Sequence, residues 1–183
     1  MLLHMVFLLS ACTYWQPTQT AKRRFLLEVY NVTCHGFQSP VIMFECGFKH
    51  LAKSRFALSS AMVFNRELPR SVQVGIDVDS LPKNGKKLRK RMDLKINLCD
   101  LLNHVNLLPI VKDYMLSLYR STNWPILCPF LANHQYNMTD LTITEENIPP
   151  HGQISQFNAS ILLIDKGRLF SKYTVFGALV PRS

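Results

Sequence analysis

Residues 71–98 read SVQVGIDVDSLPKNGKKLRKRMDLKINL, and this stretch decides the fold class. From Val72 to Val78 apolar residues occupy every second position, which is the period of a half-buried β-strand. The pair Asn84-Gly85 follows, and such pairs favour hairpin turns because both residues tolerate positive φ. An alternation of apolar and mostly charged residues returns, with Leu88, Met92, Leu94, Ile96 and Leu98 as its apolar members. We therefore expect a β-hairpin whose second strand has one dry face and one strongly basic face.

The segment before this hairpin has the same period. The bulky residues Phe56, Leu58, Met62 and Phe64 alternate with Arg55, Ala57, Ser59 and Asn65, and a run that contains Pro69 interrupts the pattern before Val72. A period of two on both sides of a short break predicts two antiparallel strands. We expect these strands and the hairpin to form one continuous meander.

The period changes to that of a helix at Cys99. Leu101, Leu102, Val105 and Leu108 have helical spacing, and apolar residues continue at that spacing from 110 to 118 after Pro109. A proline at this point stops or kinks the first segment and opens the second. We expect a helical insert that ends before Cys128.

Three further β-like segments, at 141–144, 154–165 and 168–180, follow the insert, and one more, 25–32, precedes the meander. The total is six to seven antiparallel strands, which predicts a mainly β protein with an immunoglobulin-like sandwich or cup and a helical insert.

The first residues resemble a targeting segment. Leu2 to Ala11 is apolar, with the length of a signal-peptide core and about half that of a membrane span, although no basic residue precedes it. We expect residues 1–20 to be a signal peptide, cleaved between 11 and 20, and residues 21–183 to be a single secreted, extracellular domain with no transmembrane segment. A lipoprotein site at Cys12 and a buried N-terminal strand or helix remain as alternatives.

Removal of Cys12 with the leader leaves four cysteines, an even set that suits disulfides in an oxidising compartment. Four cysteines allow three connectivities, and sequence alone does not choose among them. We favour the local pairs Cys34–Cys46 and Cys99–Cys128, because each pair brackets one compact excursion of the chain.

The sequence holds three N-glycosylation acceptor motifs, beginning at Asn31, Asn137 and Asn158. If the strand that holds Val29 continued, Asn31 would share its buried face. A glycan at Asn31 therefore requires that strand to end first.

The formal net charge is +9, and basic residues concentrate on the second strand of the hairpin. We expect a basic surface formed by Lys87, Arg89, Arg91 and Lys95, suited to acidic lipid head groups, glycans or an extracellular receptor. The simpler alternative is the solvated face of an amphipathic strand. A nucleic-acid partner is not expected, because no aromatic residues are interleaved with these charges.

The apolar strand faces carry bulky residues that could line a cavity for a hydrophobic small molecule or lipid. An ordinary packed core is the alternative for each of them. The candidate ligand-binding residues are Phe44, Phe56, Met62, Phe64, Leu94, Ile96, Phe157, Phe170 and Phe176.

No catalytic pattern is present in the sequence. The histidines are scattered, no serine lies in a G-x-S-x-G elbow, and Cys34-His35 lacks the further ligands of a zinc site. We expect no enzymatic activity, no catalytic residues, no metal and no cofactor.

Two segments resemble a known family. Asn97-Leu98-Cys99-Asp100-Leu101-Leu102, a helix, and then Asn123-Trp124-Pro125-Ile126-Leu127-Cys128-Pro129-Phe130 are similar to the signature of domain of unknown function 1091, an insect secreted family expanded in flies. Asn31-Val32-Thr33-Cys34, Cys46 and Pro149-Pro150-His151-Gly152 agree, so the resemblance spans residues 25 to 180.

That family is similar in architecture to lipid-recognition domains of the ganglioside-activator and Niemann-Pick type, which bind lipids between their sheets. The resemblance implies a non-enzymatic extracellular role, with chemosensation and cuticular pheromone lipids as the setting. The long insert between Cys99 and Cys128 departs from the compact lipid-recognition pattern. Two hypotheses result: a carrier of a hydrophobic ligand, and an interaction protein with a packed core and a basic face.

Overall fold

The structure is a computed structural model that describes residues 23–82, 85, 87–103 and 116–182. The expected signal peptide and the middle of the expected insert, residues 104–115, lie outside the described residues, as does most of the expected hairpin turn. The described strands and helices are β1 (Phe25–Gly36), β2 (Val41–Ala52), β3 (Arg55–Phe64), β4 (Gln73–Pro82), β5 (Arg89–Asn97), α2 (Leu98–Asn103), β6 (Gln135–Thr144), the 3-10 helix η3 (Glu145–Asn147), β7 (Ser155–Asp165) and β8 (Arg168–Pro181).

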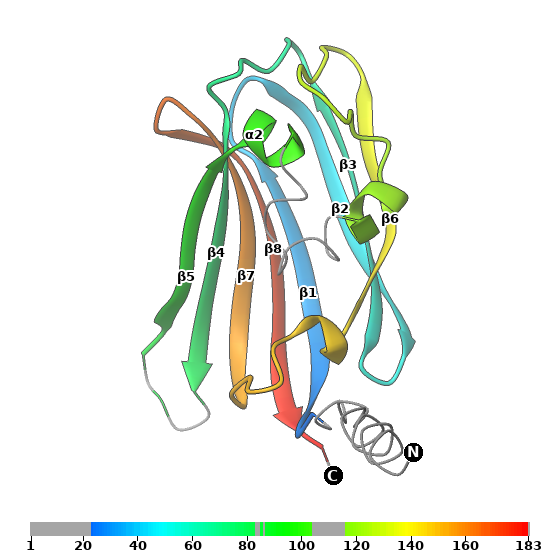
Figure 1. The fold of residues 1–183 in the computed structure, drawn as a ribbon, viewed down its shortest axis with the longest axis vertical. Coiled ribbons are helices and arrows are strands. Elements are labelled where there is room, and N and C mark those ends of the chain that lie inside the picture. The colour runs from blue at the N-terminus through cyan, green and yellow to red at the C-terminus, as the bar shows by residue number, and fades with distance from the viewer. Residues whose placement is uncertain (1–22, 83–84, 86, 104–115, 183) are drawn as a thin grey trace, which may run out of the picture.

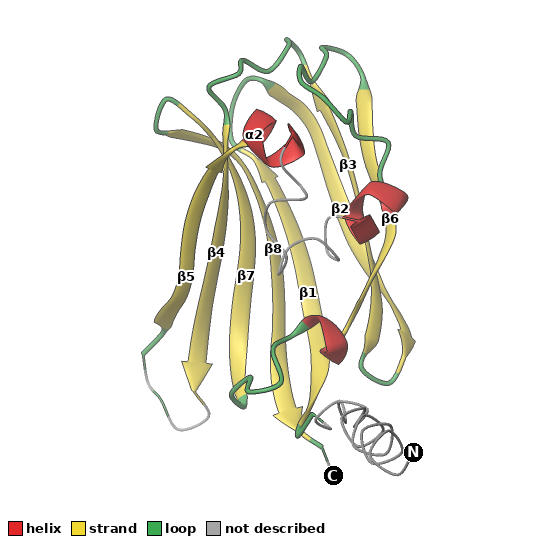
Figure 2. Ribbon diagram, viewed as in Figure 1, coloured by secondary structure: helices red, strands yellow, loops and turns green. Residues whose placement is uncertain are grey.

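The strands form two antiparallel sheets (Figures 1 and 2). The larger sheet has the order β1-β8-β7-β4-β5, and the smaller has the order β2-β3-β6. The prediction of a mainly β, sandwich-like protein is confirmed. The strand count differs, because the eight strands include β2, in which Phe44, Cys46 and Phe48 alternate with polar residues and a glycine.

The predicted meander is wrong in one connection. β3 pairs with β2 and β6 in the smaller sheet, whereas β4 pairs with β5 and β7 in the larger sheet. The connection between β3 and β4 is anchored in the core, because Leu68 and Val72 are buried and the backbone N–H of Leu68 donates to the carbonyl of Phe130. The segment around Pro69 therefore crosses between layers and is not a hairpin turn.

The larger sheet has two chemically different faces, because residues paired across strands share a face. The inner face, which includes Leu27, Val32 and Val175, packs against Phe56 of β3 and Met138 of β6. The outer face is mostly polar; its residues include Asp77, Asp79, Asp93, Lys95, Asn158 and Lys172.

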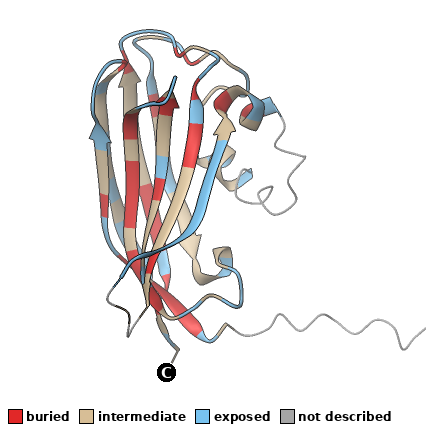
Figure 3. Cartoon of the chain, turned by 90° about the vertical axis from the view of Figure 1, so that its left-hand side faces the viewer, coloured by how far each residue is buried: buried red, intermediate tan, exposed pale blue. Residues whose placement is uncertain are grey.

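Two apolar clusters form the core. Figure 3 shows buried residues spread along several of the strands. One lies between the sheets, with Phe25 and Leu58 among its most buried members. The second lies at the end of the sandwich where α2 begins and includes Phe64, Leu102 and Phe170. The helical excursion thus contributes directly to a core.

Both disulfides have the pairing that the sequence favoured. Cys34–Cys46 links β1 to β2 and so joins the two sheets, and Cys99–Cys128 brackets the helical insert. Residues 116–121 of the insert are helical, like α2. Among the described helices, none is long and apolar enough to cross a membrane.

Candidate ligand-binding face

The inner face of the larger sheet extends beyond the strands that the smaller sheet covers. Figure 1 shows the smaller sheet on the β1 side of the molecule, away from β5 and β4. Correspondingly, Met92 and Leu94 on β5 are 47% and 40% exposed, and Ile161 on β7 is 45% exposed. We call the inner-face residues Met92, Leu94, Ile76, Val78, Ala159 and Ile161 the open face.

The open face is continuous across three strands. Leu94 lies opposite Ile76, which lies opposite Ile161, and Met92, Val78 and Ala159 form the next row in the same way. Single exposed apolar residues are normal on a protein surface, but contiguous apolar patches mark binding sites more often. The arrangement can therefore hold an elongated apolar molecule along the sheet.

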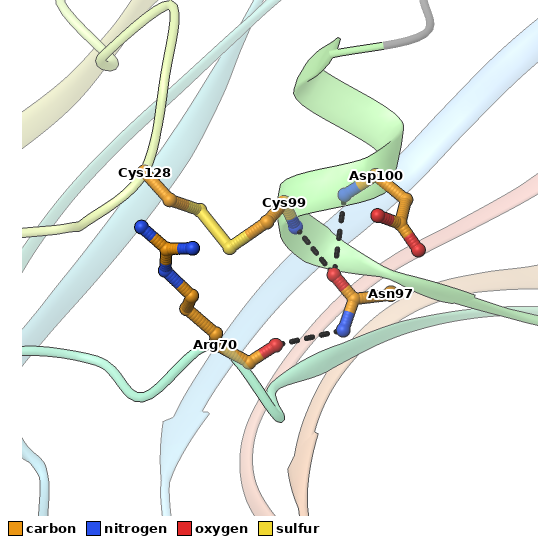
Figure 4. Close-up of a disulfide and its surroundings, with 5 residues drawn as sticks. All are labelled: Arg70, Asn97, Cys99, Asp100 and Cys128. Atoms are coloured by element: carbon orange, nitrogen blue, oxygen red, sulfur yellow. Dashed lines mark hydrogen bonds between the residues drawn. A yellow bond between two sulfur atoms is a disulfide. The ribbon is translucent and has the colours of Figure 1, made fainter.

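The helical insert bounds one end of the open face. Ile76 and Leu163 pack against the cluster that contains Leu98 and Leu102 of α2. At the start of this helix, the side-chain oxygen of Asn97 accepts hydrogen bonds from the backbone N–H groups of the next turn (Figure 4). The end of the face is thus positioned by a capped and disulfide-linked helix.

Two arginines bound the opposite end of the open face. The register of β5 against β4 shifts between Met92 and Lys90, so that Arg89 lies opposite Ser80 on the inner face. Arg91, the extra residue in this shift, donates from Nε to Ser80 Oγ at 2.7 Å and from Nη2 to Gln153 Oε1 at 2.9 Å. A β-bulge of this kind redirects a side chain.

A buried hydroxyl lies at the inner edge of the open face. Tyr173 on β8 is opposite Ile161, is 8% exposed, and its hydroxyl has no hydrogen-bond partner within the part of the chain that the structure describes. Burial raises the pKa of Tyr173 well above its ordinary value. The side chain therefore stays neutral and offers one donor.

The candidate ligand-binding residues do not form one group. Phe56, Phe64 and Phe170 are fully packed in the two core clusters. Partly buried members of the same clusters are Phe44, Met62 and Phe157. Leu94 and Ile96, in contrast, lie on the inner face of β5, where the expectation of a dry face is wrong because β5 is an edge strand that the smaller sheet does not cover.

Phe176 differs from the other candidates in the face on which it lies. It pairs with Asn158 on β7 and Asn31 on β1, on the outer face of the larger sheet. Its inclusion in an interior site is therefore wrong, because it points to the opposite side of the sheet from Val175. Phe176 follows Val175 directly, and successive strand residues face opposite sides.

The predicted basic surface is divided between two faces. Lys95 lies on the outer face opposite Gly75, whereas Arg89 and Arg91 lie on the inner side of the sheet. Lys87 is exposed just before β5. The expectation that these residues share one face is wrong, because the β-bulge at Arg91 changes the alternation.

The three glycosylation motifs lie on outer surfaces. A register shift at Tyr30 places Asn31 on the outer face, where it is exposed although β1 continues to Gly36. The requirement that the strand end before Asn31 is therefore wrong. Asn158 shares this outer face, and Asn137 lies on the outer side of β6.

Two of the surface depressions that described residues form contain no candidate ligand-binding residue. One is lined by polar side chains that include Lys53, Arg55 and Glu145, and the other includes Gly47, Ser59 and Asn137. Within the described residues, no group of three histidine, cysteine or acidic side chains could hold a metal ion.

Part of the chain matches the model of a protein family. The model of the family described as "Protein of unknown function (DUF1091)" matches residues 72–155. The match supports the resemblance of the two signature segments to this family of unknown function. No curated protein matches the chain. The matched region contains β4, β5, α2 and both cysteines of the Cys99–Cys128 disulfide, and thus both strands that carry most of the open face.

Proposed function

We propose that the protein is a secreted, non-enzymatic binding protein that holds a hydrophobic small molecule, a lipid or a pheromone-like compound, against the open face. The observation that carries this proposal is the contiguous apolar surface of Met92, Leu94 and Ile161, which are 47%, 40% and 45% exposed. Covering such a surface with an apolar ligand is favourable by about 25 cal/mol per Å² removed from water.

Secretion is supported by three features. The leader-like segment at residues 1–20 and the two disulfides suit an oxidising export route. The outward positions of Asn31, Asn137 and Asn158 leave room for glycans that do not cover the open face. A chemosensory role is part of the proposal through the resemblance to the insect secreted family.

The competing hypothesis, an interaction protein that uses a basic face, has less support. Lys95 and Arg91 lie on different sides of the sheet. Lys90, which joins Lys95 on the outer face, is paired with Asp93 at 2.6 Å and lies 3.9 Å from Asp77. The cations on this face are therefore mixed with acids.

Expression of the full chain in insect cells tests the proposal. Protein purified from the medium is expected to carry lipid that mass spectrometry detects after solvent extraction. Leu94→Gln places an amide on the open face and should reduce the amount of bound lipid. Ile126→Gln is the matched control, since Ile126 is 73% exposed and lies outside the open face.

Two results would contradict the proposal. Lipid-free protein that also fails to take up a neutral fluorescent fatty ester would refute the proposed function. Equal lipid loss in Leu94→Gln and Ile126→Gln would show that the open face is not the binding site.

A further inference from the structure

We propose that the ligand of the open face is a single-chain amphiphile with an anionic head group, of the long-chain fatty acid class, whose head group lies at Arg89 and Arg91. This inference rests on the proposed function and specifies the chemistry of its ligand. It is carried by the position of the two arginines at one end of a surface that is otherwise uncharged.

Charge is distributed unequally between the two faces of the larger sheet. Along the paired rows from Ile96 to Arg89, the described inner-face residues of β5, β4 and β7 include no acidic side chain. The acids within these rows, Asp77, Asp79 and Asp93, lie on the outer face together with Lys90 and Lys95. No carboxylate of these rows therefore lies beside Arg89 and Arg91 on the inner side of the sheet.

The Arg91 guanidinium is hydrogen-bonded to neutral groups. Its two hydrogen bonds go to the neutral oxygens Ser80 Oγ and Gln153 Oε1, and neither neutralises the charge. These contacts fix the orientation of the group but use only part of its five N–H donors. The remaining donors can bind a carboxylate in the bidentate manner that arginine favours.

The open face is long enough for an acyl tail. The row from Leu94 to Tyr173 crosses three strand spacings, about 14 Å, and Ser80 lies four residues along β4 from Ile76, about another 13 Å. An extended acyl tail from the arginines can therefore cross Met92 and Leu94 and reach Ile161. Both ends of the amphiphile then contact groups of matching chemistry.

Protection of an edge strand is the alternative explanation for these cations. β5 is an edge strand, and charged residues and bulges on edges prevent pairing with other chains. Lys90 and Lys95 on the outer face of β5 are sufficient for that purpose. Edge protection gives no reason for two arginines at the end of the apolar inner face, whereas an anionic head group would bind to them there.

Titration calorimetry on delipidated, full-length secreted protein tests the inference with palmitate and hexadecanol as probes. Palmitate is expected to bind more tightly than the alcohol of the same chain length. Arg89→Gln/Arg91→Gln should weaken palmitate binding by about tenfold or more and leave hexadecanol binding unchanged. Lys95→Gln/Lys172→Gln removes the same charge from the outer face and should leave both affinities unchanged.

The single variant Arg89→Gln keeps the test open if the double variant does not fold, since the structure shows no side-chain hydrogen bond from Arg89 to a described residue. Equal affinity of the wild type for both probes, or wild-type palmitate affinity in the arginine variants, would overturn the anionic head group and leave the proposed function intact. Failure of both probes to bind would instead count against the proposed function.

Discussion

The side-chain oxygen of Asn97 accepts a hydrogen bond from the backbone N–H of Cys99 at 2.9 Å. It also accepts one from Asp100 at 3.1 Å, while its amide nitrogen donates to the carbonyl of Arg70 at 2.7 Å (Figure 4). Asn97 thus caps α2, whose second residue, Cys99, forms the disulfide to Cys128, and it ties that helix to the connection between the two sheets.

Asn97→Ala should lower the free energy of unfolding by about 1 kcal/mol, because two backbone N–H groups lose their acceptor. Asn97→Asp keeps the capping oxygen but loses the donor to Arg70, so its loss should be smaller. Urea unfolding at pH 7 measures both. Asn103→Ala, at the exposed last residue of α2, is the control and should change little. A loss equal to that of Asn103→Ala would contradict the capping role.

Glu145 should make stability depend on pH. Burial alone would raise the pKa of Glu145, but hydrogen bonds from Ser54 and from its own backbone, together with Arg182 at 2.8 Å, bring that pKa below its ordinary value of 4.5. A lowered folded-state pKa stabilises the protein above the unfolded pKa, and this contribution is lost as the pH falls through the folded pKa.

Glu145→Gln should therefore destabilise the protein at pH 7 by about 1 kcal/mol, and the difference from wild type should shrink as the pH falls below about 4.5. Urea unfolding at several pH values measures the difference. Glu146→Gln is the control, because the carboxylate of Glu146 makes no ion pair among the described residues. A difference that grows at low pH would show that the sign is wrong.

Gly177 allows two strands and an aromatic ring to approach closely. A Cβ at this position would lie 2.7 Å from Phe157 Cζ and would also clash with the carbonyl oxygen of Glu28. Gly177→Ala should therefore destabilise the protein by about 1 to 3 kcal/mol through overpacking. At Gly47, no atom lies within 4 Å of such a Cβ, so Gly47→Ala should be neutral or stabilising. Thermal unfolding of the two variants would contradict this account if their midpoints were equal.

The alternation of residues predicted most of the strands and the local spacing of cysteines predicted both disulfides, but neither could show which surfaces are covered. Leu94 has the pattern of a core residue, yet it is exposed because β5 is an edge strand beyond the smaller sheet. The bulges at Tyr30 and Arg91 reverse the alternation, and neither residue type signals a bulge. The position of the open face depends on these non-local features, so the sequence predicted only some of its residues.

Tyr173→Phe should leave the stability of the ligand-free protein unchanged or raise it by about 1 kcal/mol. The buried hydroxyl of Tyr173 has no partner among the described residues, so removing it relieves a desolvation cost without breaking a hydrogen bond. Tyr136→Phe is the matched control: Tyr136 is similarly buried, but its hydroxyl accepts from the backbone N–H of Leu131 at 2.6 Å, so its loss should cost about 1 kcal/mol. Urea unfolding of delipidated protein measures both, and a larger loss in Tyr173→Phe than in Tyr136→Phe would show that the Tyr173 hydroxyl is bonded in the free protein.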